Sequence, residues 1–254
     1  MRVLRVEHAG SATYCLWRDE LTLERLDDAP WRSGKLTGEL LARPDTRLLC
    51  PVEPSKIVCV GRNYAAHAKE LGNDVPKEPL LFLKPPSSLI ANGDMIVLPS
   101  QSERVEHEAE IGVVIGRRLR QASEAEARAA IFGFTCVNDV TARDLQRRDV
   151  QFTRAKSFDS FCPVGPWIET SHDPEDLTII GRVNGSQRQC AHTRDMVFSV
   201  VTLLRFISSI MTLEPGDLIA TGTPDGVGPL SPEDVVEIEI AGLGTLINVV
   251  EKAV

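Results

Sequence analysis

Acidic residues with a regular spacing offer the first candidate chemistry in this chain. The segment "VEHEAEIGVVIG" (105–116) carries Glu106, Glu108 and Glu110 at every second position and then continues into apolar residues. In an extended strand, alternate side chains lie on one face, so these three carboxylates would project together. Close carboxylates repel each other unless the strand end is solvated, a proton is shared or a divalent cation lies between them. The segment alone leaves both a solvated strand end and a cation site open.

A second segment adds a possible further metal ligand. In "FTCVNDVTARD" an apolar run ends at Asn138 and Asp139, just before an expected helix. Asp139 could simply cap that helix, because Asp is favoured at the N-cap position. If it instead joins the glutamates, the result is a site of carboxylates without a Cys or His cluster. Such a hard oxygen site suits Mg²⁺, Mn²⁺ or Ca²⁺ better than zinc.

A histidine and a glutamate form another candidate constellation in "VGRNYAAHAKELG" (60–72). If "YAAHAKEL" is a short helix, His67 and Glu70 are at positions i and i+3 and share a face, where the carboxylate can orient the imidazole. A general base that takes a proton from water near neutral pH needs this arrangement. The alternative is a surface helix on which the two side chains are an ordinary solvated pair.

Basic residues complete this inventory: Arg62, Arg143 and Lys156. Each is an ordinary surface charge unless the fold places it beside the acids. Lys156, in "RAKSFDSFCPVGP", lies between a polar helix and an apolar segment. Its ammonium group could be partly buried there, facing carboxylates or an anionic substrate.

Composition excludes several classes of protein. The 254 residues are 43% hydrophobic, enough for a substantial core. Acidic residues outnumber basic ones by 36 to 28, and no long Lys/Arg run follows, so nucleic acid is not an expected partner. The start has no apolar signal region, and the most apolar helical stretch, 197–213, is too short and polar to span a bilayer. Six cysteines without a CxxC motif suit a reducing compartment, so we expect a cytoplasmic protein without a membrane partner.

The elements that would position these residues are mostly strands. Short apolar runs bounded by Gly or Pro predict strands at 56–61, 80–85, 110–116, 178–185, 217–222, 235–240 and 245–250. Two helices are predicted, 124–132 after Ser123 as N-cap, and 195–213 with apolar residues at spacings of three and four. So little helix between the strands indicates a β-dominated α+β fold and not alternating βαβ units.

A change of composition marks a domain boundary. Residues 43–56, "RPDTRLLCPVEPSK", carry three prolines. Before this stretch, short alternating pieces such as "YCLWRD" predict a small β-rich N-terminal unit, residues 1–50, with no assigned chemistry. Residues 51–254 are then the catalytic domain.

Six motifs together resemble the fumarylacetoacetate hydrolase family, especially its short acylpyruvate hydrolase-like and 2-hydroxyhepta-2,4-diene-1,7-dioate isomerase-like members. They are "GRNYAAHAKE", "LFLKPPSSL", "VEHEAEIGVVIG", "VNDVTARD", "AKSFDSFCPVGP" and "LIATGTPDGVG", in that order across 56–254. The resemblance implies a mixed β-roll of the type found in that family's C-terminal domain, a homodimer, and Mg²⁺ or Mn²⁺, with Ca²⁺ also suitable, as cofactor.

The resemblance also assigns roles residue by residue. It implies metal ligands at Glu108, Glu110 and Asp139, and leaves Glu106 as a flanking acid. It implies catalytic roles for His67, Glu70 and Lys156. It implies substrate contacts at Arg62, Tyr64, Arg143 and Thr223.

The expected reaction is metal-dependent hydrolysis of the carbon-carbon bond of an acylpyruvate-like 2,4-dioxo acid, such as fumarylpyruvate, acetylpyruvate or fumarylacetoacetate. His67, held by Glu70, would activate water, and the metal and Lys156 would stabilise the enolate that cleavage leaves. The alternative is a 2-oxo acid decarboxylase or isomerase of aromatic catabolism, acting on oxaloacetate, 5-carboxymethyl-2-hydroxymuconate or 2-hydroxyhepta-2,4-diene-1,7-dioate. A more distant alternative is a non-catalytic binding protein on the same scaffold.

Overall fold

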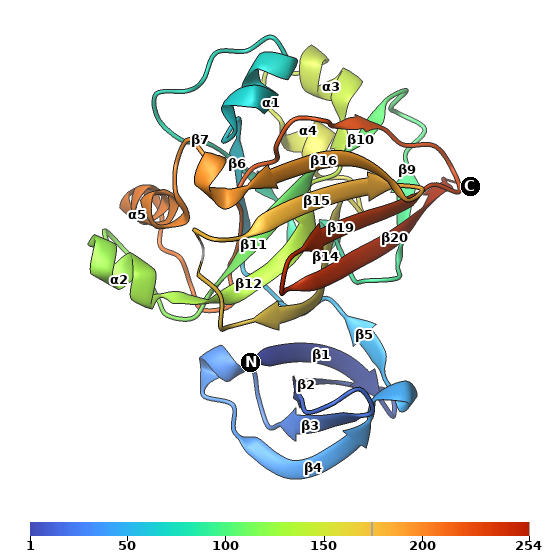
Figure 1. Cartoon of the computed structure of the whole chain (residues 1–254), viewed down its shortest axis with the longest axis vertical. Coiled ribbons are helices and arrows are strands. Elements are labelled where there is room, and N and C mark those ends of the chain that lie inside the picture. The colour runs from blue at the N-terminus through green and yellow to red at the C-terminus, as the bar shows by residue number, and fades with distance from the viewer. Residues whose placement is uncertain (174, 254) are drawn as a thin grey trace.

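Strands dominate the computed structural model, which describes residues 1–173 and 175–253. They form three sheets, of which the two larger have mixed pairing and the smallest is antiparallel, in agreement with the β-dominated fold that the sequence predicts (Figure 1). Each of the seven strands predicted after residue 55 overlaps an observed strand. Among the described residues, no helix is long and apolar enough to cross a membrane.

The largest sheet has twelve strands. Its main path is β4 (Leu36–Ala42), β3 (Thr22–Leu26), β2 (Ser11–Trp17), β1 (Arg2–His8), β14 (Cys162–Glu169), β12 (Ile131–Asn138), β11 (Ala109–Ile115), β17 (Leu218–Ala220), β6 (Ile57–Gly61) and β7 (Leu80–Lys84). Off this path, β5 (Arg47–Leu49) pairs with β1, and β8 (Leu89–Ile90) pairs with β14.

Two smaller sheets complete the fold. The five-stranded sheet has the order β16 (Ser186–His192), β15 (Thr178–Val183), β19 (Val235–Ile240), β20 (Gly244–Lys252) and β9 (Met95–Leu98). The three-stranded sheet has the order β13 (Thr141–Ala142), β10 (Val105–His107) and β18 (Gly228–Pro229).

Strand β11 is buried on both faces, which explains its continuous apolar sequence. Ile111 and Val113 belong to the main core, together with Ile238 of β19. Val114, which points the opposite way, belongs to a second core with Ile57 of β6. A charged side chain at the start of such a strand cannot reach bulk water along either face.

The predicted helices exist but are shorter than their sequence patterns. Helix α2 (Glu124–Ala129) begins after Ser123, whose side chain forms a capping box with Glu126, and ends early because Ile131 already belongs to β12. Helix α5 (Val200–Ile210) begins after Ser199, whose side chain accepts a hydrogen bond from the Thr202 N–H as an N-cap. The start of the predicted range belongs instead to a 3₁₀ turn at Thr193–Asp195. The remaining helices are α1 (Ala65–Glu70), α3 (Arg143–Arg148) and α4 (Thr153–Lys156), and these three lie together at one end of the molecule (Figure 1).

The N-terminal strands extend the largest sheet. Strand β1 pairs antiparallel with β14, with Val3 opposite Ile168. The N-terminal ammonium group donates a hydrogen bond to Glu169 at 2.6 Å. Strands β1 to β5 form the end of the molecule opposite α1, α3 and α4 (Figure 1). The first fifty residues therefore lie far from the elements that carry the candidate site.

Candidate active site

The pairing of β11 with β12 brings the two acidic segments together. Ala109 lies opposite Asn138 in the antiparallel register, so Glu108 and Asp139 are neighbours just beyond that pair. The Asp139 N–H donates to the Glu108 carbonyl oxygen at 2.9 Å. The Glu108 N–H donates to Oδ1 of Asn138 at 3.0 Å. The strand register and the Asn138 side chain thus place two of the acids side by side.

Three carboxylates converge at this point. Oxygens of Glu108, Glu110 and Asp139 lie within 4.8 Å of one another. All three side chains are buried, so a solvated strand end is the wrong interpretation. Asp139 is also not a helix cap, because α3 begins at Arg143 with Ala142 at its N-cap. These are the three residues for which metal ligation was predicted.

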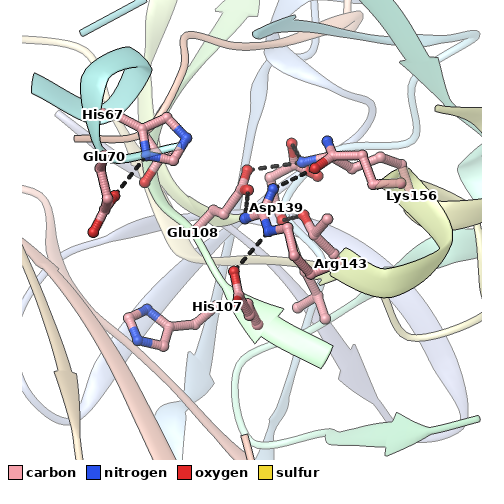
Figure 2. Close-up of polar contacts among 12 residues, drawn as sticks. His67, Glu70, His107, Glu108, Asp139, Arg143 and Lys156 are labelled. Atoms are coloured by element: carbon pink, nitrogen blue, oxygen red, sulfur yellow. Dashed lines mark hydrogen bonds and ion pairs between the residues drawn. The ribbon is translucent and has the colours of Figure 1, made fainter. Parts of the chain in front are cut away.

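Two buried lysines neutralise one edge of the cluster. Lys84 Nζ donates to Oδ1 of Asp139 at 2.6 Å, and Lys156 Nζ donates to Oδ2 at 2.7 Å. Lys156 also donates to Glu108 at 2.7 Å (Figure 2). Burial lowers the pKa of Lys156, but Asp139 and Glu108 outweigh burial and leave the pKa above its usual value. The Lys156 ammonium therefore stays charged at neutral pH.

Arg143 neutralises the opposite edge. Its Nε donates to Glu106 at 2.6 Å and its terminal nitrogen bonds Glu108. Glu106 also accepts from Arg104 at 2.6 Å and is not one of the three clustered carboxylates. Burial raises the pKa of Glu108, but Lys156 and Arg143 outweigh burial and leave the pKa far below its usual value. Glu106 thus holds Arg143 in place, which answers the role left open by the sequence.

Glu110 differs from its two neighbours because no described residue forms an ion pair with it. Its Oε2 accepts a hydrogen bond from the Gly222 N–H at 2.8 Å. Burial, and then the charges of Asp139 and Glu108, raise the pKa of Glu110 well above its usual range. A divalent cation would supply the missing charge, and carboxylate oxygens are the donors that Mg²⁺ and Mn²⁺ prefer. The donor set therefore fits a hard dication.

The loop that binds Glu110 is shaped by a glycine. Gly222 has φ +99°, and a Cβ there would lie 2.7 Å from Cβ of Asn63 and 3.0 Å from the Val60 carbonyl oxygen. Both the left-handed backbone and the crowding exclude a side chain. Only glycine lets this N–H approach the carboxylate.

The predicted His67–Glu70 pair forms on α1. The His67 Nδ1 and Glu70 Oε2 atoms are 3.0 Å apart (Figure 2). His67 is buried, whereas 31% of the Glu70 side chain is exposed. Glu70 also accepts from the Gly226 N–H at 2.9 Å, which connects α1 to the C-terminal loop. With Nδ1 directed at Glu70, the other ring nitrogen of His67 is available to a ligand.

A cavity of about 220 Å³ joins these groups. Phe82 and Phe152 supply an apolar wall, and their rings are 5.7 Å apart. Lys156 Nζ lies 4.9 Å from the centre of the Phe82 ring. The predicted site residues that line the cavity are Arg62, His67, Glu108, Glu110, Asp139, Arg143, Lys156 and Thr223.

The predicted substrate-binding residues divide into two groups. Arg62 and Arg143 present charge to the cavity, and Thr223 lies in its wall while donating to the Ala109 carbonyl oxygen at 2.9 Å. Tyr64 does not line the cavity, and its buried hydroxyl has no hydrogen-bond partner. Burial and the nearby Glu110 raise the Tyr64 pKa far above its usual value. The structure thus gives Tyr64 no place in the cavity lining, and its role in substrate binding stays a prediction.

Sequence reasoning missed several residues of the site. Lys84 is inside the quoted motif "LFLKPPSSL", but a lysine at a strand end carries no signal of burial. Gln189 of β16 accepts from His107 at 3.1 Å and donates to Thr223 at 2.7 Å, so it connects two sheets beneath the site. Gln146 and Arg147 line the cavity, and their spacing from Arg143 on one helix could have indicated this.

Comparison with known proteins gives the class of protein. A family model described as "Fumarylacetoacetate (FAA) hydrolase C-terminal" matches residues 56–251, and one described as "Rv2993c-like, N-terminal" matches residues 1–51. The chain therefore belongs to the fumarylacetoacetate hydrolase family, as its motifs suggested.

Individual relatives refine this result. Protein Rv2993c of Mycobacterium tuberculosis is 46% identical over 232 residues, which cover 90% of this chain and 88% of that protein. The mitochondrial oxaloacetate tautomerase FAHD2A of Bos taurus is 43% identical over 222 residues, covering 82% of this chain and 71% of that protein. The crystal structure of a 5-carboxymethyl-2-hydroxymuconate delta-isomerase from Mycobacterium smegmatis matches with a TM-score of 0.93, 39% identity and 100% coverage of both chains. These names support the isomerase alternative at least as well as the hydrolysis that was expected first.

Proposed function

We propose that this chain is an isomerase of 2-oxo acids that moves a proton between oxygen and carbon and so interconverts enol and keto forms. The observation that carries the proposal is the convergence of three acids, a charged lysine and a histidine on one small cavity. The names of the tautomerase and isomerase relatives support it. The same cavity would take a small 2-oxo acid as its ligand.

The dication that fits Glu108, Glu110 and Asp139, Mg²⁺ or Mn²⁺, would chelate the 2-oxo acid and withdraw electrons from its carbonyl group when bound. Lys156 lies beside this position with its charge fixed by Glu108 and Asp139. It would stabilise negative charge on the substrate oxygen as the enolate develops. Arg143 forms ion pairs with Glu106 and Glu108. It would therefore hold the Glu108 carboxylate in position at the edge of the cavity.

Proton transfer requires a group that can both accept and donate near neutral pH. His67 faces the cavity and its Nδ1 is oriented by Glu70. Its other ring nitrogen would deliver a proton to the substrate carbon or remove one from it. Glu70 would act by holding the ring in one orientation.

Hydrolysis of a carbon-carbon bond is the second candidate, because one specific observation favours it. The His67–Glu70 pair has the arrangement expected of a base that activates water, because a carboxylate contacts one ring nitrogen of a histidine that lines the cavity. Decarboxylation of oxaloacetate would use the same enolate stabilisation by Lys156 without an attacking water.

One panel of assays separates these reactions. The purified chain with Mg²⁺ would be given oxaloacetate enol, 5-carboxymethyl-2-hydroxymuconate, acetylpyruvate and fumarylpyruvate, with products identified by NMR. We expect ketonisation or double-bond migration without carbon-carbon cleavage. Cleavage of acetylpyruvate or fumarylpyruvate as the fastest reaction would instead establish the hydrolase, and release of CO₂ from oxaloacetate would establish the decarboxylase.

A further inference from the structure

One face of helix α3 is directed at the cavity. Arg143, Gln146 and Arg147 all line it, and their i, i+3 and i+4 spacing places them on a single helical face. Arg148, the next residue, is exposed and does not line the cavity. The helix therefore presents two guanidinium groups to a ligand, one buried and one near the entrance.

The buried cations of the site are already occupied by acids. Arg143 binds Glu106 and Glu108, and it also bonds Gln146. Lys156 binds Glu108 and Asp139. Within the described part of the chain, Arg147 forms no ion pair with any acid, although it lines the same cavity. Its charge is free for a ligand.

With a dication bound, the net charge of the cavity would favour an anionic ligand. Three buried acids line the cavity, Glu108, Glu110 and Asp139, together with two buried cations, Lys156 and Arg143. A divalent cation at the acids would turn this small negative excess into a positive one, to which Arg147 adds. A substrate with a single carboxylate near the dication leaves the lining guanidinium groups of Arg62 and Arg147 unmatched, whereas a second carboxylate would neutralise one of them.

We propose that Arg147 binds the second carboxylate of a 2-oxo diacid and so selects diacids over monoacids. This inference rests on the proposed function of the site. A guanidinium group is a planar fork that binds a carboxylate through two parallel hydrogen bonds, a geometry that lysine cannot reproduce. Because Arg143 ties α3 to Glu108, the backbone of Arg147, an exposed residue, lies one helical turn beyond an anchored position. This placement makes Arg147 a specificity-determining residue for diacids.

Arg62 is the competing candidate. It also lines the cavity and forms no ion pair with a described residue. However, it has φ +58°, a left-handed conformation that is uncommon for arginine, and it follows β6 on the His67 side of the site. We assign the second carboxylate to Arg147, because its helix is anchored directly to a predicted metal ligand.

The test compares Arg147→Met with Arg148→Met in the full chain with Mg²⁺. Arg148 is the matched control, an exposed arginine at the next position of the same helix. For oxaloacetate enol, we expect Arg147→Met to raise KM by about tenfold to a hundredfold, the usual loss when a charged hydrogen-bond pair is removed. For acetylpyruvate, a monoacid, KM and kcat should stay unchanged, and Arg148→Met should change neither substrate. An Arg147→Lys variant should recover only part of the diacid preference.

Calorimetry separates this inference from the proposed function. Arg147→Met should weaken binding of oxaloacetate to the Mg²⁺-loaded chain and leave binding of oxalate, which has no remote carboxylate, unchanged. That result supports Arg147 even if no 2-oxo acid is isomerised, in which case only the proposed function fails. Equal losses for both ligands, no loss for either, or the selective loss appearing in Arg62→Met instead would overturn the assignment.

Discussion

The acid cluster and the His67–Glu70 pair face one cavity but are built in opposite ways. Glu108, Glu110 and Asp139 are buried at the ends of central strands, where cations from separate elements surround them. His67 and Glu70 lie on α1, a helix of six residues, and Glu70 is partly exposed. The buried cluster is held by ion pairs from several elements, whereas the pair on the short helix is held by one contact between a buried imidazole and a partly exposed carboxylate.

The three acids of the cluster also differ from one another in their ion pairs. Glu108 and Asp139 are neutralised by the protein itself, and Glu110 is not. Their contributions to stability and to cation binding should therefore differ even though the three side chains lie together.

The largest effect should come from the predicted metal ligands. Glu110→Gln removes a ligand without leaving a cation unpaired, so we expect loss of Mg²⁺ binding and about a thousandfold or greater loss of turnover, with little loss of stability. Glu108→Gln should lose turnover to the same extent and also lose about 3 kcal/mol of unfolding free energy, because Arg143 and Lys156 lose a buried partner. Calorimetric Mg²⁺ titration and urea unfolding measure the two effects. Equal destabilisation by both variants would contradict the distinction between these acids.

The next effect concerns stability alone. Lys84→Met leaves one oxygen of Asp139 without its cation, in a site where Lys84 is fully buried. We expect the free energy of unfolding to fall by about 3 kcal/mol. Lys69→Met, on the exposed surface of α1, is the control and should change it by less than about 0.5 kcal/mol. A Lys84→Met variant as stable as the control would show that the ion pair does not support the cluster.

A smaller effect is expected on the proton-transfer side. His67→Ala should lower turnover by about a hundredfold, the usual contribution of a positioned acid or base, while Mg²⁺ binding stays unchanged. Glu70→Gln should lower turnover by about tenfold, because it only orients the ring. Steady-state assays with oxaloacetate enol and acetylpyruvate measure both. If His67→Ala abolished only acetylpyruvate cleavage, the histidine would serve water activation, which favours the hydrolase.

The smallest effect is a pH dependence of stability. The folded pKa of Glu110 is raised above its ordinary value of 4.5, so its stabilising contribution is full below that value and is lost as pH rises through the raised pKa. After treatment with EDTA, the wild-type melting temperature should therefore fall from acidic to neutral pH more than that of Glu110→Gln. Thermal unfolding across this pH range measures the difference. Parallel profiles for the two proteins would refute a raised pKa at this residue.

Much of the site could be predicted because its signals are local. The acids at the strand ends, the i, i+3 pair on α1 and the lysine before an apolar segment are all visible in short stretches. Lys84 and Arg147 were missed for a physical reason: a strand-end lysine and a helical arginine look the same in sequence whether they face water or a cavity. The predicted homodimer and substrate contacts stay predictions.

The sequence by itself determined the strand-rich fold class, which depends on side-chain type and on the two-residue period of a strand. The family motifs, and not that period, distinguished Glu108, Glu110 and Asp139 from Glu106. The tertiary structure decided how those acids are used. Lys84 comes from β7, Arg143 from α3 and Lys156 from α4, and only their packing around the β11–β12 pair neutralises Glu108 and Asp139. Glu110 has no cationic partner because no described element places one beside it. The residues around Glu110 in the sequence do not predict this, because it depends on the packing of distant elements.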